Sequence, residues 1–308
     1  MNSPDASPAA LGFIGLGQIG APMASRWLDW PGGLRVFDVV ANAMSSFVDR
    51  GAVGCASPAE VASGARVISI MVRDDDEVRE VLTGPEGILH RAAPGSVVAI
   101  HSTISAATAI ELAAAASSVG VGVLDAPVSG GFMGAHHGTL ALMVGGEQWA
   151  FEVARPVLDK LGTLVSHMGD IGSGTRTKLA RNLIHFVAFA ATGEAARVAE
   201  AAGISPAELG RIVRHTDAVT GGPGAVLLRD TAAPLAADDG LRAPFTHAAA
   251  LGDKDLRLAI ELAAELGVDT PLACMARTLL AEALGVAPSA APTAALVAPG
   301  ANDDRNDG

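Results

Sequence analysis

The sequence predicts an α/β domain built on a doubly wound parallel sheet, followed by an all-helical domain. From residue 9 to residue 168, short β-rich runs alternate with helical patterns, which is the arrangement of successive βα units. After Gly169 the β-branched runs disappear, and stretches rich in Ala, Leu, Arg and Glu continue to Leu284. The length of 308 residues fits two domains, because a single domain usually has roughly 100 to 200 residues.

Composition excludes several classes of protein. Half of the residues are hydrophobic and 18% are charged, which is not the composition of a disordered, collagen-like or disulfide-scaffold chain. A net charge of −12 argues against nucleic acid or an anionic membrane as a partner. The longest uncharged runs, such as residues 126–146, contain Pro, Gly and His, so no membrane span is expected. No signal peptide is expected either, because no basic segment precedes an apolar stretch at the N-terminus.

The cysteines point to a reducing compartment. Cys55 and Cys274 lie far apart and form no CxxC pair, so neither a zinc site nor a disulfide framework is indicated. The histidines show no HxxxH or HExxH spacing, and we expect no metal site. We expect a cytoplasmic protein.

We expect seven strands in the first domain, and each is a short run rich in β-branched or aromatic residues. They are residues 9–15, 34–38, 66–72, 96–102, 120–127, 140–146 and 163–168. Because helical patterns separate these runs, the sheet is expected to be mainly parallel.

Two helix starts carry a capping box with proline at the first helical position, at residues 57–60 and 205–208. One helical pattern runs from Thr175 to Ala202 with only Gly193 to weaken it, so a long helix is expected at the domain junction. We expect a dinucleotide-binding domain at residues 1–171, a helical substrate and dimerisation domain at residues 172–286, and a disordered tail at residues 287–308.

A glycine-rich loop follows the first expected strand, with the sequence Gly15-Leu16-Gly17-Gln18-Ile19-Gly20. A GxGxxG between strand and helix binds the pyrophosphate of a dinucleotide, because the glycines permit a tight turn and a close approach to the helix N-terminus. The second strand ends at Asp38, 18 positions after Gly20, where a carboxylate accepts hydrogen bonds from the adenosine ribose. No arginine follows Asp38 before Arg50, so NAD is favoured over NADP.

Two further segments carry candidate chemistry. Residues 125–131 read Asp-Ala-Pro-Val-Ser-Gly-Gly, and a hydroxyl among small residues with free N–H groups suits a substrate carboxylate. The spacing of Lys178 and Asn182 places them on one face of the long helix. A buried lysine has a lowered pKa and exchanges protons near neutral pH. From the residue pattern alone, two alternatives remain: residues 125–131 could be an ordinary strand end, and Lys178 could face solvent.

Five motifs in order resemble the β-hydroxyacid dehydrogenase family, which includes 3-hydroxyisobutyrate dehydrogenases and shares an NAD-binding domain with 6-phosphogluconate dehydrogenase. They are FIGLGQIGAPMA at residues 13–24, STIS at 102–105, DAPVSGG at 125–131, GSGTRTKLARN at 172–182 and KDLRLA at 254–259. The resemblance implies an N-terminal doubly wound Rossmann domain and an all-α C-terminal domain, joined by a long interdomain helix, with the active site between the domains.

The resemblance also implies roles for individual residues. Lys178 matches the catalytic lysine and Asn182 the substrate-orienting asparagine, and Ser129, Gly130 and Gly131 match the substrate-carboxylate loop. Thr103 matches a position near the nicotinamide, and Lys254 a lysine that closes over the cofactor, with Asp255 a weaker candidate. Without the resemblance, Lys254 and Asp255 read as a surface charge pair. The cofactor-binding residues we expect are Gly15, Leu16, Gly17, Gln18, Ile19, Gly20, Asp38, Met71, Val72, Thr103 and Lys254.

Three departures from the family pattern affect substrate choice. Many relatives have an aspartate two residues before the serine of the Ser-Thr pair, in a DxST pattern, whereas this chain reads Ile100-His101-Ser102-Thr103. Arg181 stands where relatives commonly have a second asparagine. Residues 215–223, where relatives often place aromatic specificity residues, contain none.

The expected activity is hydride transfer between the nicotinamide of NAD and a small 3-hydroxy acid, or its semialdehyde or keto form, with Lys178 as general acid and base. An imine reductase and a non-catalytic dinucleotide-binding protein are the alternatives. Lys178 and Asp38 argue against the former, and the Lys178–Asn182 pair against the latter. We expect a homodimer or homotetramer.

Overall fold

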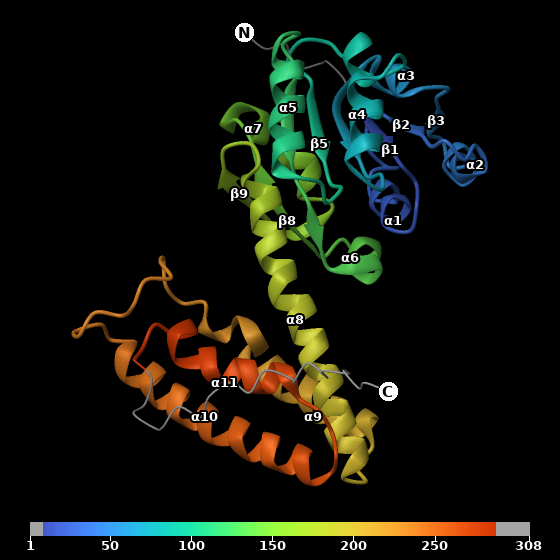
Figure 1. The fold of residues 1–308 in the computed structure, drawn as a ribbon. Helices are drawn as coiled ribbons and strands as arrows, with labels where there is room; N and C mark the ends of the chain where they lie inside the picture. Colours follow the sequence, from blue (N-terminus) through green and yellow to red (C-terminus); the bar gives the residue numbers. More distant parts are fainter. Residues whose placement is uncertain (1–8, 288–308) are drawn as a thin grey trace, which may run out of the picture. The chain divides into compact units, whose positions relative to one another are not determined.

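The computed structural model describes residues 9–287, and the chain divides into two compact units, Met1–Leu183 and Ile184–Gly308 (Figure 1). The first unit holds the β-sheet and the second is helical. From residue 288 onward, the expected tail lies outside the described residues.

All seven expected strands are present in one sheet of nine. The two additional strands have only two residues each, which is too short for a hydrophobic pattern to reveal. The strands are β1 (Ala10–Ile14), β2 (Leu34–Phe37), β3 (Val53–Gly54), β4 (Ala65–Ile70), β5 (Val97–Ile100), β6 (Gly122–Asp125), β7 (Val128–Ser129), β8 (Leu140–Gly145) and β9 (Gly162–Gly169).

The strand order is β3-β2-β1-β4-β5-β6-β8-β7, and β9 also pairs with β8. The six strands from β3 to β6 are parallel. Strand β8 runs antiparallel to both β6 and β7, and parallel to β9. The prediction of a mainly parallel, doubly wound sheet is therefore confirmed, with an antiparallel turn at one end.

The sheet is buried on both faces, as parallel sheets require. On β5, Val97 and Ala99 belong to one apolar cluster, whereas Val98 and Ile100 belong to the other. The first cluster lies under α1 (Gly20–Ser25), α6 (Gly131–His137) and α7 (Gln148–Leu158). The second lies under α3 (Pro58–Ala62), α4 (Asp75–Thr83) and α5 (Ala106–Ser117), and Figure 1 shows α4 and α5 side by side. Helix α2 (Asn42–Val48) and the 3₁₀ turn η1 (Ile88–His90) complete the unit.

The two expected helix starts differ in detail. Ser57 caps α3, because its Oγ accepts the Glu60 N–H at 3.2 Å, and the Glu60 carboxylate accepts the Ala56 N–H at 2.8 Å. Helix α9 (Pro206–Thr220) also begins at the expected proline, but Ser205 makes no capping hydrogen bond through its side chain. Its start is therefore set by Pro206 rather than by a reciprocal cap.

The long helix is α8 (Ser173–Ala201), within two residues of the expected limits, and it runs from the first unit into the second. The second unit continues with α9, η2 (Gly222–Val226), α10 (Arg242–Glu265) and α11 (Pro271–Ala283). Its fully buried core is small and centres on Phe245, Ala249 and Leu284. Among the described residues, no helix is both long and apolar enough to span a membrane.

Candidate active site

The parallel strands end together at one edge of the sheet. Ile14 is aligned with Phe37 and with Ile70, Ile70 with Ile100, and Ile100 with Asp125. Ligands of doubly wound sheets bind outside the carboxyl ends of the strands. The predicted cofactor-binding residues that precede α8 follow β1, β2, β4 or β5, so this edge carries them. The predicted carboxylate loop comes after β6, at the end of the short strand β7.

The glycine-rich loop has the geometry that its three glycines allow. Gly15 has a φ of +89°, and a Cβ there would lie 2.2 Å from the Met71 carbonyl oxygen. A Cβ on Gly20, the first residue of α1, would lie 2.0 Å from the Gly15 carbonyl oxygen. Gly17 is exposed and has open space where a Cβ would be. The loop is therefore tight at both ends and open at its centre, which fits a diphosphate lying against the backbone.

Asp38 lies beside this loop. Its carboxylate accepts the Leu16 N–H at 2.6 Å and the Val40 N–H at 2.8 Å. The structure thus joins the end of β2 to the loop after β1, as a ribose-binding carboxylate requires. Residues 39–41, which follow Asp38, are exposed and uncharged.

The remaining cofactor candidates of the first unit lie on the next two loops. Met71 and Val72 follow β4, and the exposed Thr103 follows β5. The buried Ser102 joins these loops, because its Oγ accepts the Val72 N–H at 2.9 Å and donates to the Val72 carbonyl at 2.8 Å. Thr103 is consequently held beside Val72 at the sheet edge.

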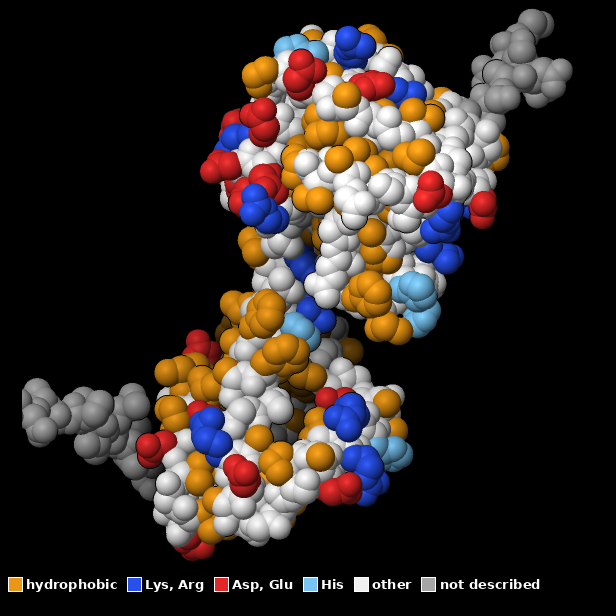
Figure 2. Space-filling model, turned by 90° about the vertical axis from the view of Figure 1, so that its right-hand side faces the viewer, with side chains coloured by type: hydrophobic (Ala, Val, Ile, Leu, Met, Phe, Trp, Pro, Cys, Tyr) orange, Lys and Arg blue, Asp and Glu red, His pale blue; other side chains and the backbone are white. Residues whose placement is uncertain are grey.

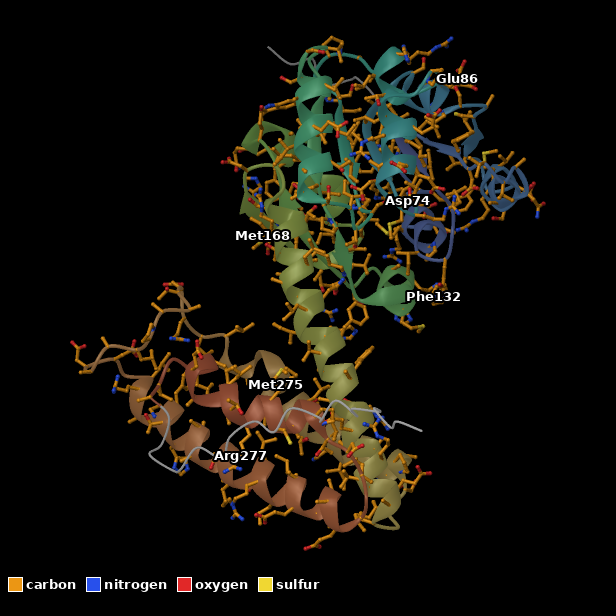
Figure 3. The ribbon with its side chains drawn as sticks, viewed as in Figure 1. Asp74, Glu86, Phe132, Met168, Met275 and Arg277 are labelled. Carbon is orange, nitrogen blue, oxygen red and sulfur yellow. The ribbon has the colours of Figure 1, made fainter. Side chains whose placement is uncertain are left out.

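The candidate carboxylate loop turns from β7 into α6. Ser129 is half-buried at the end of β7, and Gly130 and Gly131 have φ values of +131° and +62°, which favour glycine. Gly131 opens α6, so this turn presents backbone N–H groups beside the serine hydroxyl. The next residue, Phe132, is exposed on α6 (Figure 3).

Lys178 meets this loop. Its side chain lies in the second turn of α8, the residue is only 9% exposed, and its Nζ donates to the Val128 carbonyl at 2.5 Å. Burial lowers the pKa of Lys178, and the nearby charge of Arg181 lowers it further. The structure therefore places a desolvated amine beside the residue that precedes Ser129.

Asn182 lies one turn beyond Lys178 on the same helix face and is half-buried. Its Oδ1 accepts from Nη1 of Arg181 at 3.3 Å. The arginine that departs from the family pattern thus contacts one candidate residue and lowers the pKa of the other. Sequence reasoning recognised Arg181 only as a departure and missed this electrostatic effect.

Lys254 lies in the second unit, on α10. Its Nζ pairs with the Asp255 carboxylate at 2.9 Å, and both side chains are exposed. This is the surface charge pair that the residues alone indicated, and a role of Lys254 toward the cofactor stays a prediction.

Two buried groups were not singled out from the sequence as site residues. Asp125 ends β6, and its carboxylate accepts the Gly172 N–H at 2.8 Å and the Thr175 N–H at 2.6 Å. His101 contacts Ser69 through Nε2 at 2.7 Å and the Ala126 carbonyl through Nδ1 at 2.8 Å. Burial lowers the pKa of His101 to about 4, so it is neutral at pH 7. Because a carbonyl only accepts, the proton lies on Nδ1, and Ser69 donates to Nε2.

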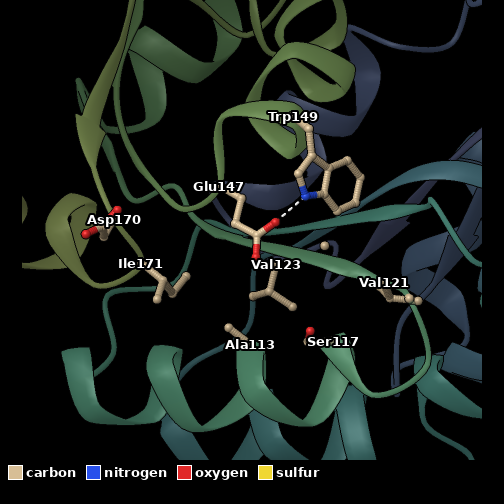
Figure 4. A pocket seen from close by; sticks show the side chains of 10 residues that line it. Ala113, Ser117, Val121, Val123, Glu147, Trp149, Asp170 and Ile171 are labelled. Atoms are coloured by element: carbon tan, nitrogen blue, oxygen red, sulfur yellow. Dashed lines mark hydrogen bonds between the residues drawn. The ribbon is translucent and has the colours of Figure 1, made fainter.

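A cavity of about 410 Å³ lies elsewhere in the first unit, between α5 and the start of α7 (Figure 4). Glu147 accepts a hydrogen bond from the Trp149 indole in its wall. None of the predicted site residues lines this cavity. Within residues 9–287, no group of three or more His, Cys, Asp or Glu side chains is arranged to hold a metal ion.

Two family models match the chain. Residues 10–169 match the NAD-binding domain of 6-phosphogluconate dehydrogenase, and residues 172–299 match the NAD-binding domain of NADP-dependent 3-hydroxyisobutyrate dehydrogenase. Together they cover most of the sequence.

Individual relatives agree with these models. An uncharacterized oxidoreductase of Mycobacterium tuberculosis is 49% identical over 276 residues, covering 90% of this chain and 93% of the relative. In Pseudomonas aeruginosa, 3-hydroxyisobutyrate dehydrogenase is 36% identical, covering 87% and 90%, and NAD-dependent L-serine dehydrogenase is 35% identical, covering 87% and 90%. A solved oxidoreductase from Mycobacterium avium is 47% identical with a TM-score of 0.86, covering 92% of this chain and all of that one.

Proposed function

Because the chain belongs to the 3-hydroxyisobutyrate dehydrogenase family of hydroxy-acid oxidoreductases, we propose that it interconverts a small 3-hydroxy acid and its semialdehyde or keto form. The observation that carries this proposal is the hydrogen bond from the buried Nζ of Lys178 to the Val128 carbonyl. It brings a proton-transferring group to a loop suited to a carboxylate. Such a pairing is what oxidation of a carboxylate-bearing alcohol needs.

The proposed cofactor is NAD rather than NADP. Asp38 is a carboxylate at the end of β2, and it would repel a 2′-phosphate while accepting hydrogen bonds from ribose hydroxyls. The uncharged residues 39–41 offer no cation for a phosphate. A relative 35% identical to this chain is named as NAD-dependent.

The loop of residues 15–20 would hold the diphosphate, and Met71, Val72 and Thr103 would line the path toward the nicotinamide. When bound, the nicotinamide accepts the hydride in oxidation and returns it in reduction. Lys254 is proposed to contact the cofactor from the second unit.

Lys178 is the proposed general acid and base. In oxidation its neutral amine takes the hydroxyl proton, and in reduction its ammonium gives the proton back. The lowered pKa of Lys178 increases the neutral fraction at a given pH. Asn182 is proposed to orient the reacting oxygen, because its amide lies on the same helix face.

The substrate carboxylate is proposed to lie against Ser129, Gly130 and Gly131. The serine hydroxyl and the free N–H groups of this turn are donors, and donors to a carboxylate form strong, charge-assisted hydrogen bonds. Fixing the carboxylate here would hold the carbinol carbon close to Lys178.

A panel of 3-hydroxy acids tests this function, with turnover followed by the absorbance of the reduced cofactor and with NAD and NADP in parallel. We expect turnover of at least one acid with NAD, and loss of turnover in Lys178→Ala. Absence of oxidation with every acid and both cofactors, in a protein that still binds NAD, would overturn the proposal and favour the non-catalytic alternative. Reduction of cyclic imines without any activity on hydroxy acids would favour an imine reductase.

We also propose that the protein is cytoplasmic and forms a homodimer or homotetramer. Cys55 and Cys274 are both free thiols, which fits a reducing compartment. Exposed apolar residues on the helices of the second unit, such as Met275 and Leu279, favour an oligomer.

A further inference from the structure

Asp125 is a buried carboxylate with two backbone partners. It is fully buried at the end of β6, and its two oxygens accept N–H groups from residues 47 and 50 positions further along the chain. Because burying a carboxylate is costly without hydrogen bonds, these two contacts are what keep it in place. Both donors belong to the start of α8.

Helix α8 has no cap of its own at this end. Its first helical residue is Ser173, and the residue before it is Gly172, which has no side chain. The first N–H groups of a helix lack partners within the helix, and a neighbouring Ser, Thr, Asp or Asn usually accepts from them. Asp125 does this from a strand, and its negative charge also faces the positive end of the helix dipole.

The first turn of α8 lies very close to the backbone around Asp125. A Cβ on Gly174 would lie 2.3 Å from the Asp125 carbonyl oxygen and 2.3 Å from that of Met143. A Cβ on Gly145 would lie 2.4 Å from Oδ1 of Asp125. The first turn of α8 therefore packs directly on the ends of β6 and β8.

The start of α8 and the segment that follows β6 are joined by a second contact. Lys178 follows Thr175 by three residues, and its partner Val128 follows Asp125 by three residues. The capping bond and the lysine bond consequently form two successive links between one helix and one loop. A shift of the helix start would move Nζ away from the candidate substrate loop.

We propose that Asp125 is a positioning residue for Lys178: its carboxylate caps α8 from strand β6 and thereby holds the lysine Nζ beside the loop of residues 129–131. This inference rests on the proposed function only for the catalytic role of Lys178. The location of the lysine is a separate property, and it is measurable without turnover.

The charges around the lysine make the direction of its titration informative. The ionisable groups on the surrounding segments are Arg176 and Arg181 on α8, Asp170 before it, Asp125 on β6, His101 after β5, His136 and His137 on α6, and His167 on β9. Burial and the charge of Arg181 lower the pKa of Lys178 in the wild type. Releasing Lys178 into solvent would raise that pKa toward its ordinary value.

The test compares the wild type with Asp125→Asn, which keeps the shape but offers one acceptor oxygen to two donors. We expect unchanged NAD affinity and a fall in kcat at pH 7 of up to about a hundred-fold, the cost of misplacing a reacting group by about 1 Å. We also expect the pH–rate midpoint to rise, so that high pH recovers part of the rate. A structural role alone would lower the rate without raising the midpoint.

Chemical labelling reads the lysine directly. The chain has three lysines, Lys160, Lys178 and Lys254, so acetylation over a range of pH followed by mass spectrometry reports each one. In Asp125→Asn the midpoint of Lys178 should rise, while those of Lys160 and Lys254 stay fixed. If the wild type oxidises no hydroxy acid, the proposed function fails and this measurement still decides the role of Asp125.

Glu194→Gln is the matched control. Glu194 is a buried carboxylate that accepts the Leu272 and Ala273 N–H groups at 2.8 and 3.0 Å, at the start of α11. Its loss should reduce stability without changing the titration of Lys178. An equal rise of the Lys178 midpoint in this control would overturn the inference.

If Asp125→Asn does not fold, Thr175→Pro tests whether the cap on α8 positions Lys178. Proline is tolerated in the first turn of a helix, and here it removes the N–H that donates to Asp125 while keeping the carboxylate. We expect the same rise of the Lys178 midpoint and the same fall in kcat. A lysine midpoint that stays at or below the wild-type value in the variant that folds contradicts the role assigned to Asp125.

Discussion

At the scale of single residues, the environment of Lys178 turns an ordinary amine into a group suited to proton transfer. Burial and the charge of Arg181 both disfavour the ammonium form, so its pKa is lowered. The Val128 carbonyl accepts a hydrogen bond from the amine and fixes the direction of the side chain. A group with these properties exchanges protons closer to neutral pH than an exposed lysine does.

Lys178→Arg should therefore lose most oxidation activity, by about two to four decades, although the positive charge is kept. Arginine does not release a proton in this pH range. The wild-type rate should rise with pH, because the neutral amine is the base and its fraction grows through the pKa. Initial rates from pH 6 to 10 measure this, and Lys160→Arg, an exposed lysine of the same unit, is the control.

An unchanged pH profile and near wild-type rate in Lys178→Arg would show that another group accepts the proton. In that case Asn182 and a nearby histidine such as His185 would have to be tested as the group that accepts or passes on the proton. Retained NAD binding in the variant is required for either conclusion.

Asp38 governs the second prediction at this scale. In Asp38→Ala, NAD should bind more weakly, and the preference for NAD over NADP should narrow, because the repulsion of a 2′-phosphate is lost together with an acceptor for ribose. A charge-assisted hydrogen bond contributes about 1.5 to 3 kcal/mol, or roughly one to two decades in Kd. Titration with both cofactors measures the ratio, and the exposed Asp49→Ala serves as control. Tighter NADP binding by the wild type would contradict the prediction.

At the scale of elements, most helices and strands could be predicted from the sequence, whereas the contacts between them could not. The strands were visible because each is a short apolar run, and α8 because its pattern continues for more than seven turns. Strands β3 and β7 were not visible, because two residues carry no periodicity. Gly172 before α8 has no side chain that could cap the helix, so the sequence indicates that a residue from elsewhere does so. Identifying Asp125 as that residue requires knowing that the end of β6 lies against the start of α8.

The ends of β4, β5 and β6 are joined by a polar link. His101 connects Ser69 on β4 with the Ala126 carbonyl after β6. A neutral histidine provides one donor and one acceptor, which these two partners require.

This link should make the first unit sensitive to acid. The pKa of His101 is about 4 when folded and near 6.5 when unfolded, so between these values the unfolded chain binds more protons. Stability should therefore fall as pH decreases from about 6.5 to 4, by a total of roughly 3 kcal/mol for this group. The contribution is absent above pH 7, where both states are neutral.

Urea unfolding at pH 7 and pH 4.5 tests this expectation. All three tryptophans, Trp27, Trp30 and Trp149, lie in the first unit, so their fluorescence reports that unit alone. His101→Gln keeps a donor and an acceptor but does not titrate, and its stability should change less between the two pH values. An equally steep loss in the variant would assign the acid sensitivity to other groups.

At the scale of the whole molecule, the two units differ in how completely they bury their apolar residues. The first has an apolar cluster on each face of its sheet, whereas the buried cluster of the second is small. No residue of α9 or α11 is fully buried. Figure 2 shows apolar side chains spread over the visible face of the helical unit. Met275 on α11, labelled in Figure 3, is 60% exposed.

Helix α8 also leaves large apolar side chains exposed. Leu183 is 67% exposed, and Phe186 and Phe189 are each 59% exposed. A large exposed apolar surface commonly marks a site of protein–protein interaction. A second copy of the chain is the partner that we propose for this surface.

The full-length chain should therefore have a mass in solution of at least twice 30.9 kDa, measured by light scattering during gel filtration. The double variant Phe186→Ser and Phe189→Ser should shift the equilibrium toward the monomer, because it removes two exposed aromatic rings from the expected interface. Val48→Ser, which changes an exposed apolar residue of the first unit, should leave the mass unchanged. A wild-type protein that remains monomeric at micromolar concentration, with its helical unit folded by circular dichroism, would show that the apolar surface is covered in another way.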